Sequence, residues 1–285
     1  MATPQIQNDP IYSLPHLYIS GLNISVASTT VLAIEPGQAR DSSDNIDMPV
    51  GFPNLQGITT PATQFDGFQP PILLNSAVNG ANGLDTGTLA ASTPYAIYLI
   101  GDSRGYKPVA ALLSKTANAF PLLPLGYDSL RLLGMINTDG SSHFVYATFK
   151  PQNMKFALSF YNSPAISVLT GGNSTTFATI DLTTNSAIPT TTLPNVIVTL
   201  QVTFTPLAAG DVVQFRPVGI TTATGYPTIV GVVAGIAQTQ YLQVFAAVGA
   251  SKPEIDYLVT SASDSVNVSV VGWTGVSNTA YPALV

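Results

Sequence analysis

The spacing of hydrophobic residues along the chain predicts β-strands of two kinds. Within Asn195–Thr205, apolar and polar side chains alternate, which is the period of a strand with one face on a core and the other exposed. The apolar positions are Val196, Val198, Leu200, Val202 and Phe204. Residues 94–101 are apolar at almost every position and lie between two turns rich in Gly and Asp. A short run of this kind, dense in aromatic and β-branched residues, predicts a strand that is buried on both faces.

The N-terminal half contains further short strands separated by turns. Residues 1–16 carry three prolines and are predicted to form an extended arm. Turn signals predict one hairpin around residues 27–29 and another across 137–140, where Asp139-Gly140 is a strong hairpin turn. Residues 35–42 and 51–82 are predicted to be turn-rich or loop-like connections. The predicted strands are residues 17–26, 30–34, 45–50, 94–101, 108–114, 130–136 and 143–149.

The pattern changes near residue 150, and strands then recur at the short spacing that is typical of a β-sandwich or jelly roll. The strands predicted there are residues 195–205, 211–216, 228–234, 240–248, 254–260 and 265–273. No segment shows the period of an amphipathic helix of useful length. The sequence therefore predicts an all-β protein with two β domains. Its parts are an extended arm (1–16), an N-terminal β anchoring domain (17–150) and a C-terminal β-sandwich or jelly-roll-like domain (151–285).

Charged residues are scarce, at 8% of the 285 residues, against roughly 25% in an ordinary soluble domain. A surface made mainly of Ser, Thr, Asn, Gln and Gly has few charges to repel neighbours, which is typical of a chain built into an assembly. The net charge is −6, and the nine Lys and Arg residues are scattered, so the basic stripe that nucleic-acid binding requires is absent. No apolar run reaches the roughly 18 residues of a membrane span, and residues 1–10 lack the pattern of a secretory signal. Without cysteine, disulfides and thiolate metal sites are excluded.

Residues that could carry chemistry are few and isolated. His16 and His143 are the two histidines, and a metal site needs several converging ligands, so we predict no metal and no cofactor. The segment Gly101-Asp102-Ser103 superficially resembles that of a hydrolase nucleophile. A nucleophilic serine needs a base and an orienting acid, and the surrounding sequence is better explained as a turn between strands.

The acidic residues and the single tryptophan give the remaining candidates. Asp41, Asp44 and Asp47 stand three apart, whereas a calcium loop uses every second position, so we predict solvated turn carboxylates. Glu35 and Glu254 form no pair for glycoside cleavage that the sequence brings together. Trp273 follows a valine-rich strand and is predicted to fill a core or an interface, with ligand stacking as the alternative. We therefore predict no catalytic residues and no enzymatic activity.

Several segments, in their order along the chain, resemble a family of tailed-bacteriophage virion proteins. They are similar to the family's succession GL-x-x-S, A-x-G-x-A-x-D-S, GGLDTG and T-Y-H-V-x-L-I, and to its later RRIGSI and GWID stretches. Ala96 departs from this pattern, since the family has His there. The segments that carry the resemblance are residues 21–25, 34–42, 82–87, 93–100, 131–136 and 268–273.

The resemblance implies a structural component of a tailed-bacteriophage virion, and it brings no catalytic residues with it. Within this class we expect a trimeric fibre- or spike-like protein on the tail or head, assembled in the host bacterial cytoplasm. Its partners would be further copies and the neighbouring tail, neck or capsid proteins. One alternative is a capsid decoration (cement) protein. Another is a carbohydrate-binding or depolymerising receptor-binding protein that contacts a host surface glycan through exposed aromatic residues.

Overall fold

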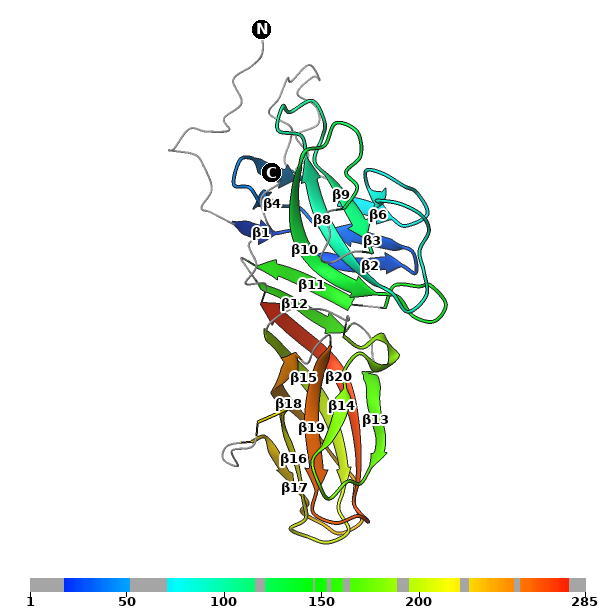
Figure 1. Ribbon diagram of the computed structural model, residues 1–285, viewed down its shortest axis with the longest axis vertical. Coiled ribbons are helices and arrows are strands. Elements are labelled where there is room, and N and C mark those ends of the chain that lie inside the picture. Colours follow the sequence, from blue (N-terminus) through cyan, green and yellow to red (C-terminus); the bar gives the residue numbers. More distant parts are fainter. Residues whose placement is uncertain are drawn as a thin grey trace. The chain divides into compact units, whose positions relative to one another are not determined.

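The computed structural model is built almost entirely from short β-strands (Figure 1). It describes residues 18–51, 71–115, 121–145, 147–152, 155–160, 165–188, 195–220, 226–248 and 252–276. In these ranges helical structure is limited to one 3-10 turn, Thr184–Ser186, and no helix is long and apolar enough to cross a membrane. The prediction of an all-β protein is confirmed. The predicted arm at 1–16, with His16, and most of the predicted loop at 51–82 lie outside the described residues.

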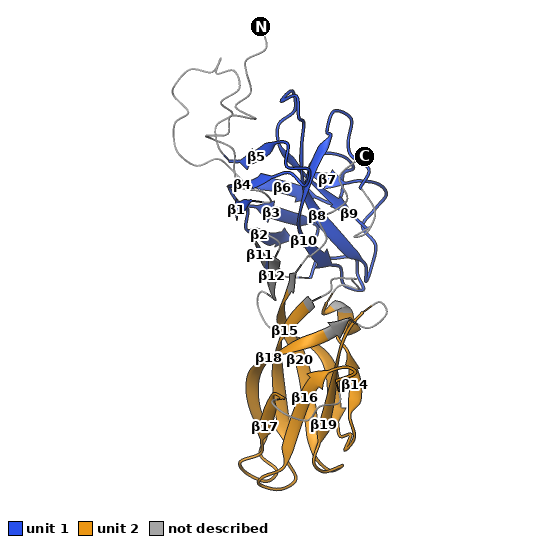
Figure 2. Cartoon of the chain, turned by 60° about the vertical axis from the view of Figure 1, so that its left-hand side comes forward, with its two compact units in different colours: residues 1–156, 279–285 blue, residues 157–278 orange. Residues whose placement is uncertain are grey.

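The chain divides into two compact units between Phe156 and Ala157 (Figure 2). Unit 1 contains the described residues before this point, and unit 2 contains those after it. The sequence pattern places the boundary slightly earlier, at 150/151. The observed division falls within β12 (Lys155–Phe160).

The described part of unit 1 contains three small sheets. Their strand orders are β1-β4-β5, β11-β2-β3-β6 and β10-β8-β9-β7. Strands β7 and β9 pair in parallel, and the other pairs are antiparallel. The bounds are β1 (Ile19–Gly21), β2 (Ile24–Ser28), β3 (Val31–Ile34), β4 (Gly37–Arg40), β5 (Asp47–Val50), β6 (Ile72–Asn75), β7 (Gly83–Leu84), β8 (Pro94–Gly101), β9 (Ala110–Ser114), β10 (Ser129–Asn137) and β11 (Ala147–Gln152).

Strand β8 lies in the core of unit 1 and is buried on both faces, as its apolar run predicts. On one face it packs in a cluster that the loop before β10 covers. That cluster consists of Ala96, Tyr98, Ile100, Ala110, Leu112 and Leu130, with Leu123, Tyr127 and Leu132 against it. On the other face, a Cβ at Gly101 would lie 2.8 Å from Cδ1 of Ile46, so the segment leading into β5 covers this side. Two-sided burial explains why the run has no alternating polar positions.

Gly83 occupies a position in unit 1 that has no room for a side chain. A Cβ there would lie 2.2 Å from the carbonyl oxygen of Val78, which already accepts a hydrogen bond from Leu84 N at 2.8 Å. The carbonyl cannot retreat without breaking that bond. We expect Gly83→Ala to lower the free energy of unfolding of unit 1 by about 2 kcal/mol, measured by urea denaturation. Gly140→Ala, where the added methyl meets open space, should change it by less than about 0.5 kcal/mol; equal losses would contradict the packing argument.

Three strand predictions for unit 1 are wrong. Residues 17–26 do not form one strand, because Gly21 and Leu22 adopt φ angles of 67° and 57° and turn the chain between β1 and β2. Residues 35–42 contain a strand, β4, which pairs with both β1 and β5. Strand β6, which pairs with β3, lies within the stretch predicted to be a loop.

One of the two predicted hairpins forms in full, and the other forms its turn and a single antiparallel bridge, Thr138–Phe144. Strands β2 and β3 pair through a turn at Thr29 and Thr30, which confirms the first. In the second, Asp139 accepts hydrogen bonds from the backbone of Ser141 and His143. Beyond this turn, however, β10 pairs with β8 and β11 pairs with β2. The chain changes sheets at Phe144, whose side chain is buried and whose N–H donates to Thr29 O.

Eight described strands of unit 2 form a jelly roll. The strands pair from the outside of the sequence inwards: β13 with β20, β14 with β19, β15 with β18 and β16 with β17. This nested pairing produces two layers, β13-β20-β15-β18 and β14-β19-β16-β17, which are joined where β18 pairs with β19 at Ala247 and Val248. It confirms the predicted sandwich or jelly roll. The bounds are β13 (Ile166–Gly172), β14 (Ala178–Asp181), β15 (Asn195–Thr205), β16 (Val212–Pro217), β17 (Thr228–Val230), β18 (Gln238–Val248), β19 (Pro253–Val259) and β20 (Ser265–Val276).

The core of unit 2 lies between the two sheets. All five apolar side chains that alternate along β15 are fully buried, which confirms that prediction. In β20 an extra residue, Val271, shifts the register against β15, so that Trp273 lies opposite Val198 and is only 2% exposed. Trp273 therefore fills the core, and its burial excludes the alternative of ligand stacking.

Two features of unit 2 differ from the predicted strands. The strand predicted at 228–234 ends at Val230, and residues 231–237 form a loop although they are apolar. Strands β13 and β14 were not predicted, since their sequences mix Gly, Thr and Ser with few apolar residues.

Candidate functional site

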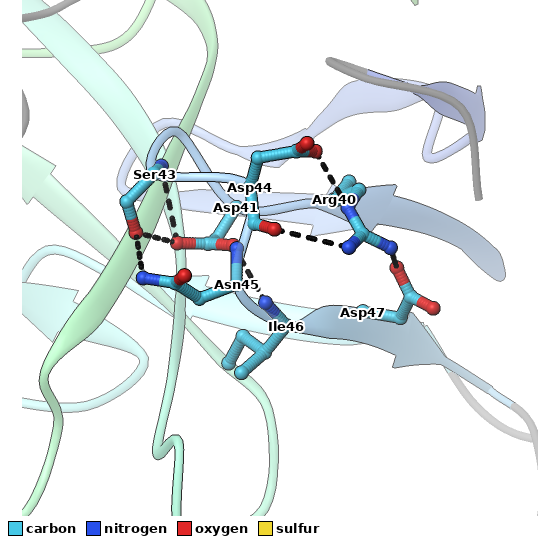
Figure 3. Close-up of polar contacts among 7 residues, drawn as sticks. All are labelled: Arg40, Asp41, Ser43, Asp44, Asn45, Ile46 and Asp47. Carbon is cyan, nitrogen blue, oxygen red and sulfur yellow. Dashed lines mark hydrogen bonds and ion pairs between the residues drawn. The ribbon is translucent and has the colours of Figure 1, made fainter. Parts of the chain in front are cut away.

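The three aspartates that resemble a calcium loop lie around the turn between β4 and β5 (Figure 3). The Asp41 carboxylate is buried. It accepts hydrogen bonds from the backbone N–H groups of Ser43, Asn45 and Ile46 at 3.1, 2.6 and 2.7 Å, and from the hydroxyl of Ser43. It therefore closes the turn by satisfying backbone donors that would otherwise point into the protein.

The other two aspartates bind an arginine. Arg40 donates from Nε to Asp44 Oδ1 at 2.5 Å and from a terminal nitrogen to Asp47 Oδ1 at 3.0 Å, and its side chain is only 7% exposed. Arg131 of β10 lies near the same group: burial lowers its pKa, while the charges of Asp41 and Asp44 act in the opposite direction. Two buried arginines thus offset two of the three negative charges of this group.

This arrangement leaves the aspartates no metal-binding role. Calcium takes six to eight oxygen ligands that converge on one point, whereas these carboxylates face separate donors of the protein. Among the described residues no group of three or more His, Asp or Glu side chains could hold a metal ion. The prediction of solvated turn carboxylates is wrong for Asp41, because the turn folds over it.

The turn also joins two segments on which the family resemblance rests. Ser42 N donates to Leu130 O at 2.8 Å, which fixes the end of residues 34–42 beside the start of residues 131–136. The candidate site in unit 1 therefore has a structural role: it stabilises the turn and connects it to β10.

Ser103 lies in a turn that hydrogen bonds to nearby side chains stabilise. Its N–H and its hydroxyl donate to the two carboxylate oxygens of Asp128, at 2.7 and 2.5 Å. Asp102 accepts from Arg104 N and Nε and from Tyr106 N. These hydrogen bonds stabilise the turn, and the serine hydroxyl is used to bind Asp128.

The side chain of Asp102 makes the stability of unit 1 sensitive to acid. Burial by itself would raise its pKa, but hydrogen bonds from Arg104 and Tyr106 outweigh this and lower it below its ordinary value. Such a carboxylate stabilises the fold above its unfolded pKa, near about 4, and this contribution is lost as the pH falls through the folded value. We expect the urea midpoint of unit 1 to decline between about pH 5 and pH 2. Asp102→Asn should flatten that decline, and an unchanged slope would contradict this assignment.

The remaining sequence candidates do not converge. His143 is half exposed, with Nδ1 3.7 Å from Asp139 Oδ2. Glu35 accepts a hydrogen bond from Asn23 in unit 1, and Glu254 lies 3.4 Å from Lys252 Nζ in unit 2. Each residue has a local partner within its own unit.

One whole sheet of unit 2 lacks charge, a feature that residue-by-residue motif reading misses. Strands β13, β20, β15 and β18 contain no Asp, Glu, Lys or Arg. The charged residues of the described part of unit 2 lie on the other sheet or in loops. Arg216 pairs with Asp256 there, and Lys252 pairs with Asp181. The signal was present in the sequence, since residues 217–251 contain no charged residue.

Two aromatic rings stand on the outer face of this uncharged sheet. Tyr241 and Phe245 of β18 are 65% and 61% exposed. Gln201 Nε2 donates to the Tyr241 hydroxyl at 2.9 Å, and the hydroxyls of Thr203 and Thr239 lie 2.9 Å apart. The face therefore combines apolar rings with side chains that both donate and accept hydrogen bonds.

Exposed aliphatic side chains continue from this face into the adjoining loops. Loop 231–237, which precedes β18, is held to the loop after β15 by a hydrogen bond from Gly235 N to Pro206 O at 2.8 Å. We call the exposed large side chains of these loops and of β18 the apolar patch. It consists of Leu207, Val232, Val233, Ile236, Tyr241 and Phe245. Monomeric soluble proteins rarely expose such a group without an interaction role.

Comparisons with known proteins give weak matches. No protein-family model matches the sequence, and no curated protein matches it. Among solved structures, a carbohydrate-binding module of Cellvibrio mixtus lichenase 5A in complex with cellotriose matches 44% of this chain and 78% of its own, at 12% identity and a TM-score of 0.19. The infectious bursal disease virus Gx strain structure matches 69% of this chain and 55% of its own, at 11% identity and a TM-score of 0.25. The VP2 subviral particle of infectious bursal disease virus matches 98% and 76%, at 13% identity and a TM-score of 0.22. TM-scores this low do not establish a common fold for the chain or a common function.

Proposed function

We propose that this chain is a structural component of a virus particle and works as a homo-oligomer. The observation that carries the proposal is the apolar patch, which covers part of β18, in a sheet without a single charged residue, and the adjoining loops. Such a surface is costly to leave in water and has no charge that would repel another subunit. The jelly roll of unit 2 is an architecture that viral capsid domains use, although architecture alone does not assign function.

The resemblance of the motif segments supports a more specific role in a tailed-bacteriophage virion. We propose a trimeric fibre- or spike-type protein attached to the tail or head. In this assignment the N-terminal part attaches the protein to neighbouring virion proteins, and unit 2 packs with its copies. No catalytic residue is assigned. A capsid decoration protein is the competing role within the same class, and the number of copies per particle separates the two.

The test is the mass of the full chain in solution and its presence in purified particles. Light scattering over a range of concentrations should give a multiple of the 29.7 kDa chain mass, with three chains for a fibre or spike. A chain that stays monomeric at high concentration would contradict the proposal. Tens of copies per particle would favour a fibre, and hundreds would favour decoration.

Carbohydrate binding is the second candidate, and the rings of Tyr241 and Phe245 favour it. Exposed rings on a sheet beside Gln and Thr side chains offer stacking surfaces and hydrogen bonds to a neutral sugar. A glycan array probed with the full chain tests this role. Absence of binding to any neutral glycan would remove it.

A further inference from the structure

The position of the apolar patch in the jelly roll defines a continuous surface on unit 2. Strand β15 ends, and β18 and β20 begin, at one end of the sandwich, where Phe204 lies opposite both Gln238 and Val266. Loops 206–211 and 231–237 lie at this same end, and their backbones bond to each other through Gly210 N and Gly231 O at 2.8 Å. The patch therefore runs from the end of the sandwich onto the outer face of β18.

Strand β18 is also an edge strand over most of its length. It pairs with β15 throughout, but its other neighbour among the described strands, β19, meets it only at Ala247 and Val248. Proteins commonly protect an edge with charged side chains or prolines. Residues 238–248 contain neither, and the outer face of β18 exposes Tyr241 and Phe245.

We infer that a second copy of this chain covers the apolar patch. The inference rests on the proposed function and names the surface through which copies associate. Five of the six side chains in the patch are pure hydrocarbon, and only Tyr241 carries a polar group. A sugar presents hydroxyl groups at most positions and would leave these groups unpaired against aliphatic surface, whereas a protein surface of the same composition does not.

The patch is self-complementary in charge and hydrogen bonding. A surface that meets its own copy must not bring like charges together, and this one carries none. The residues around the rings, Gln201, Gln243 and Thr239, each donate and accept hydrogen bonds, so they can pair with identical residues.

The exposed area also fits an interface between copies. Each of the six side chains is more than half exposed, and buried aromatic side chains alone cover about 150–250 Å² each. Together they present roughly 500–700 Å², which approaches the ~800 Å² that each partner contributes to a standard interface.

The test compares two double variants of the full chain by light scattering and native mass spectrometry. Tyr241→Glu with Phe245→Glu places charges on the patch. Thr170→Glu with Thr175→Glu adds the same charge at exposed positions of β13 and the loop after it. We expect the patch variant to dissociate at concentrations at least tenfold higher than the wild type, and the control to behave as the wild type. Circular dichroism of each variant shows whether it is folded.

A second measurement does not depend on charged variants. The chain has no cysteine, so Gln243→Cys gives a single thiol beside the two rings. A short bis-maleimide should cross-link this variant between copies, and Thr170→Cys should remain uncross-linked.

The outcomes separate this inference from the proposed function. An oligomeric wild type whose patch variant keeps its mass, with no cross-link at residue 243, overturns the inference and leaves the proposed function standing. If the patch variant stays oligomeric but no longer binds a neutral glycan that the wild type binds, the patch is a sugar-binding surface. This result also overturns the inference. A monomeric wild type removes both.

Discussion

Trp273→Ala is expected to lower the free energy of unfolding of unit 2 by about 3–5 kcal/mol, the largest loss from a single truncation in this chain. The indole is 2% exposed and lies opposite Val198, between the two sheets of the jelly roll. Its removal leaves a cavity in a core whose other large side chains cannot move in from paired strands. Trp273→Phe, which keeps most of the volume, should lose clearly less.

Urea denaturation followed by far-UV circular dichroism measures this effect, because the variant lacks the protein's one tryptophan as a fluorescent probe. Tyr106→Ala is the control, since that ring is 79% exposed, and it should change stability by less than about 0.5 kcal/mol. A comparable loss in the two variants would show that Trp273 does not support the core in this way.

Asp41→Ala is expected to destabilise unit 1 by about 2–4 kcal/mol. The substitution leaves three backbone N–H groups of the turn without their acceptor, and it removes one of the carboxylates that balance Arg40 and Arg131. Ser43→Ala removes one hydrogen bond to the same carboxylate and should cost about 1 kcal/mol. Urea denaturation of unit 1 compares the two variants.

Calcium provides the control for this assignment. Because the protein's own donors occupy the three carboxylates, millimolar calcium or a chelator should leave the melting temperature of the wild type unchanged. A calcium-dependent rise that disappears in Asp41→Ala would restore the metal-site hypothesis.

The sequence predicts the long, strongly apolar strands of this fold well and the short strands poorly. Strand β15 alternates cleanly because one of its faces meets a core, and β8 is uniformly apolar because both of its faces do. Strands β4 and β14 are only four residues long and contain few apolar residues, so neither shows a period. The apolar loop 231–237 misleads in the opposite direction: its large side chains are hydrophobic, but they are exposed and form no strand.

The candidate site was predictable only in part. Spacing alone shows that Asp41, Asp44 and Asp47 do not form a calcium loop, but it does not show that Arg131, ninety residues later, lies beside them. The jelly-roll pairing is likewise hidden, because the identity of a strand's partner depends on contacts between distant segments. The uncharged stretch at 217–251 was visible from the start, yet only the strand order shows that part of it, β18, belongs to a sheet without charged residues.

The pairing of β13 with β20 has a consequence for how this protein comes into being. Ile166 lies opposite Val270. Strand β13 therefore cannot pair until the ribosome has added about a hundred more residues. Contacts this remote in sequence slow folding, because a long loop must close before they form. Unit 2 therefore completes its sheet only after β20 has been synthesised, and until then the growing chain exposes apolar strands that are prone to aggregate.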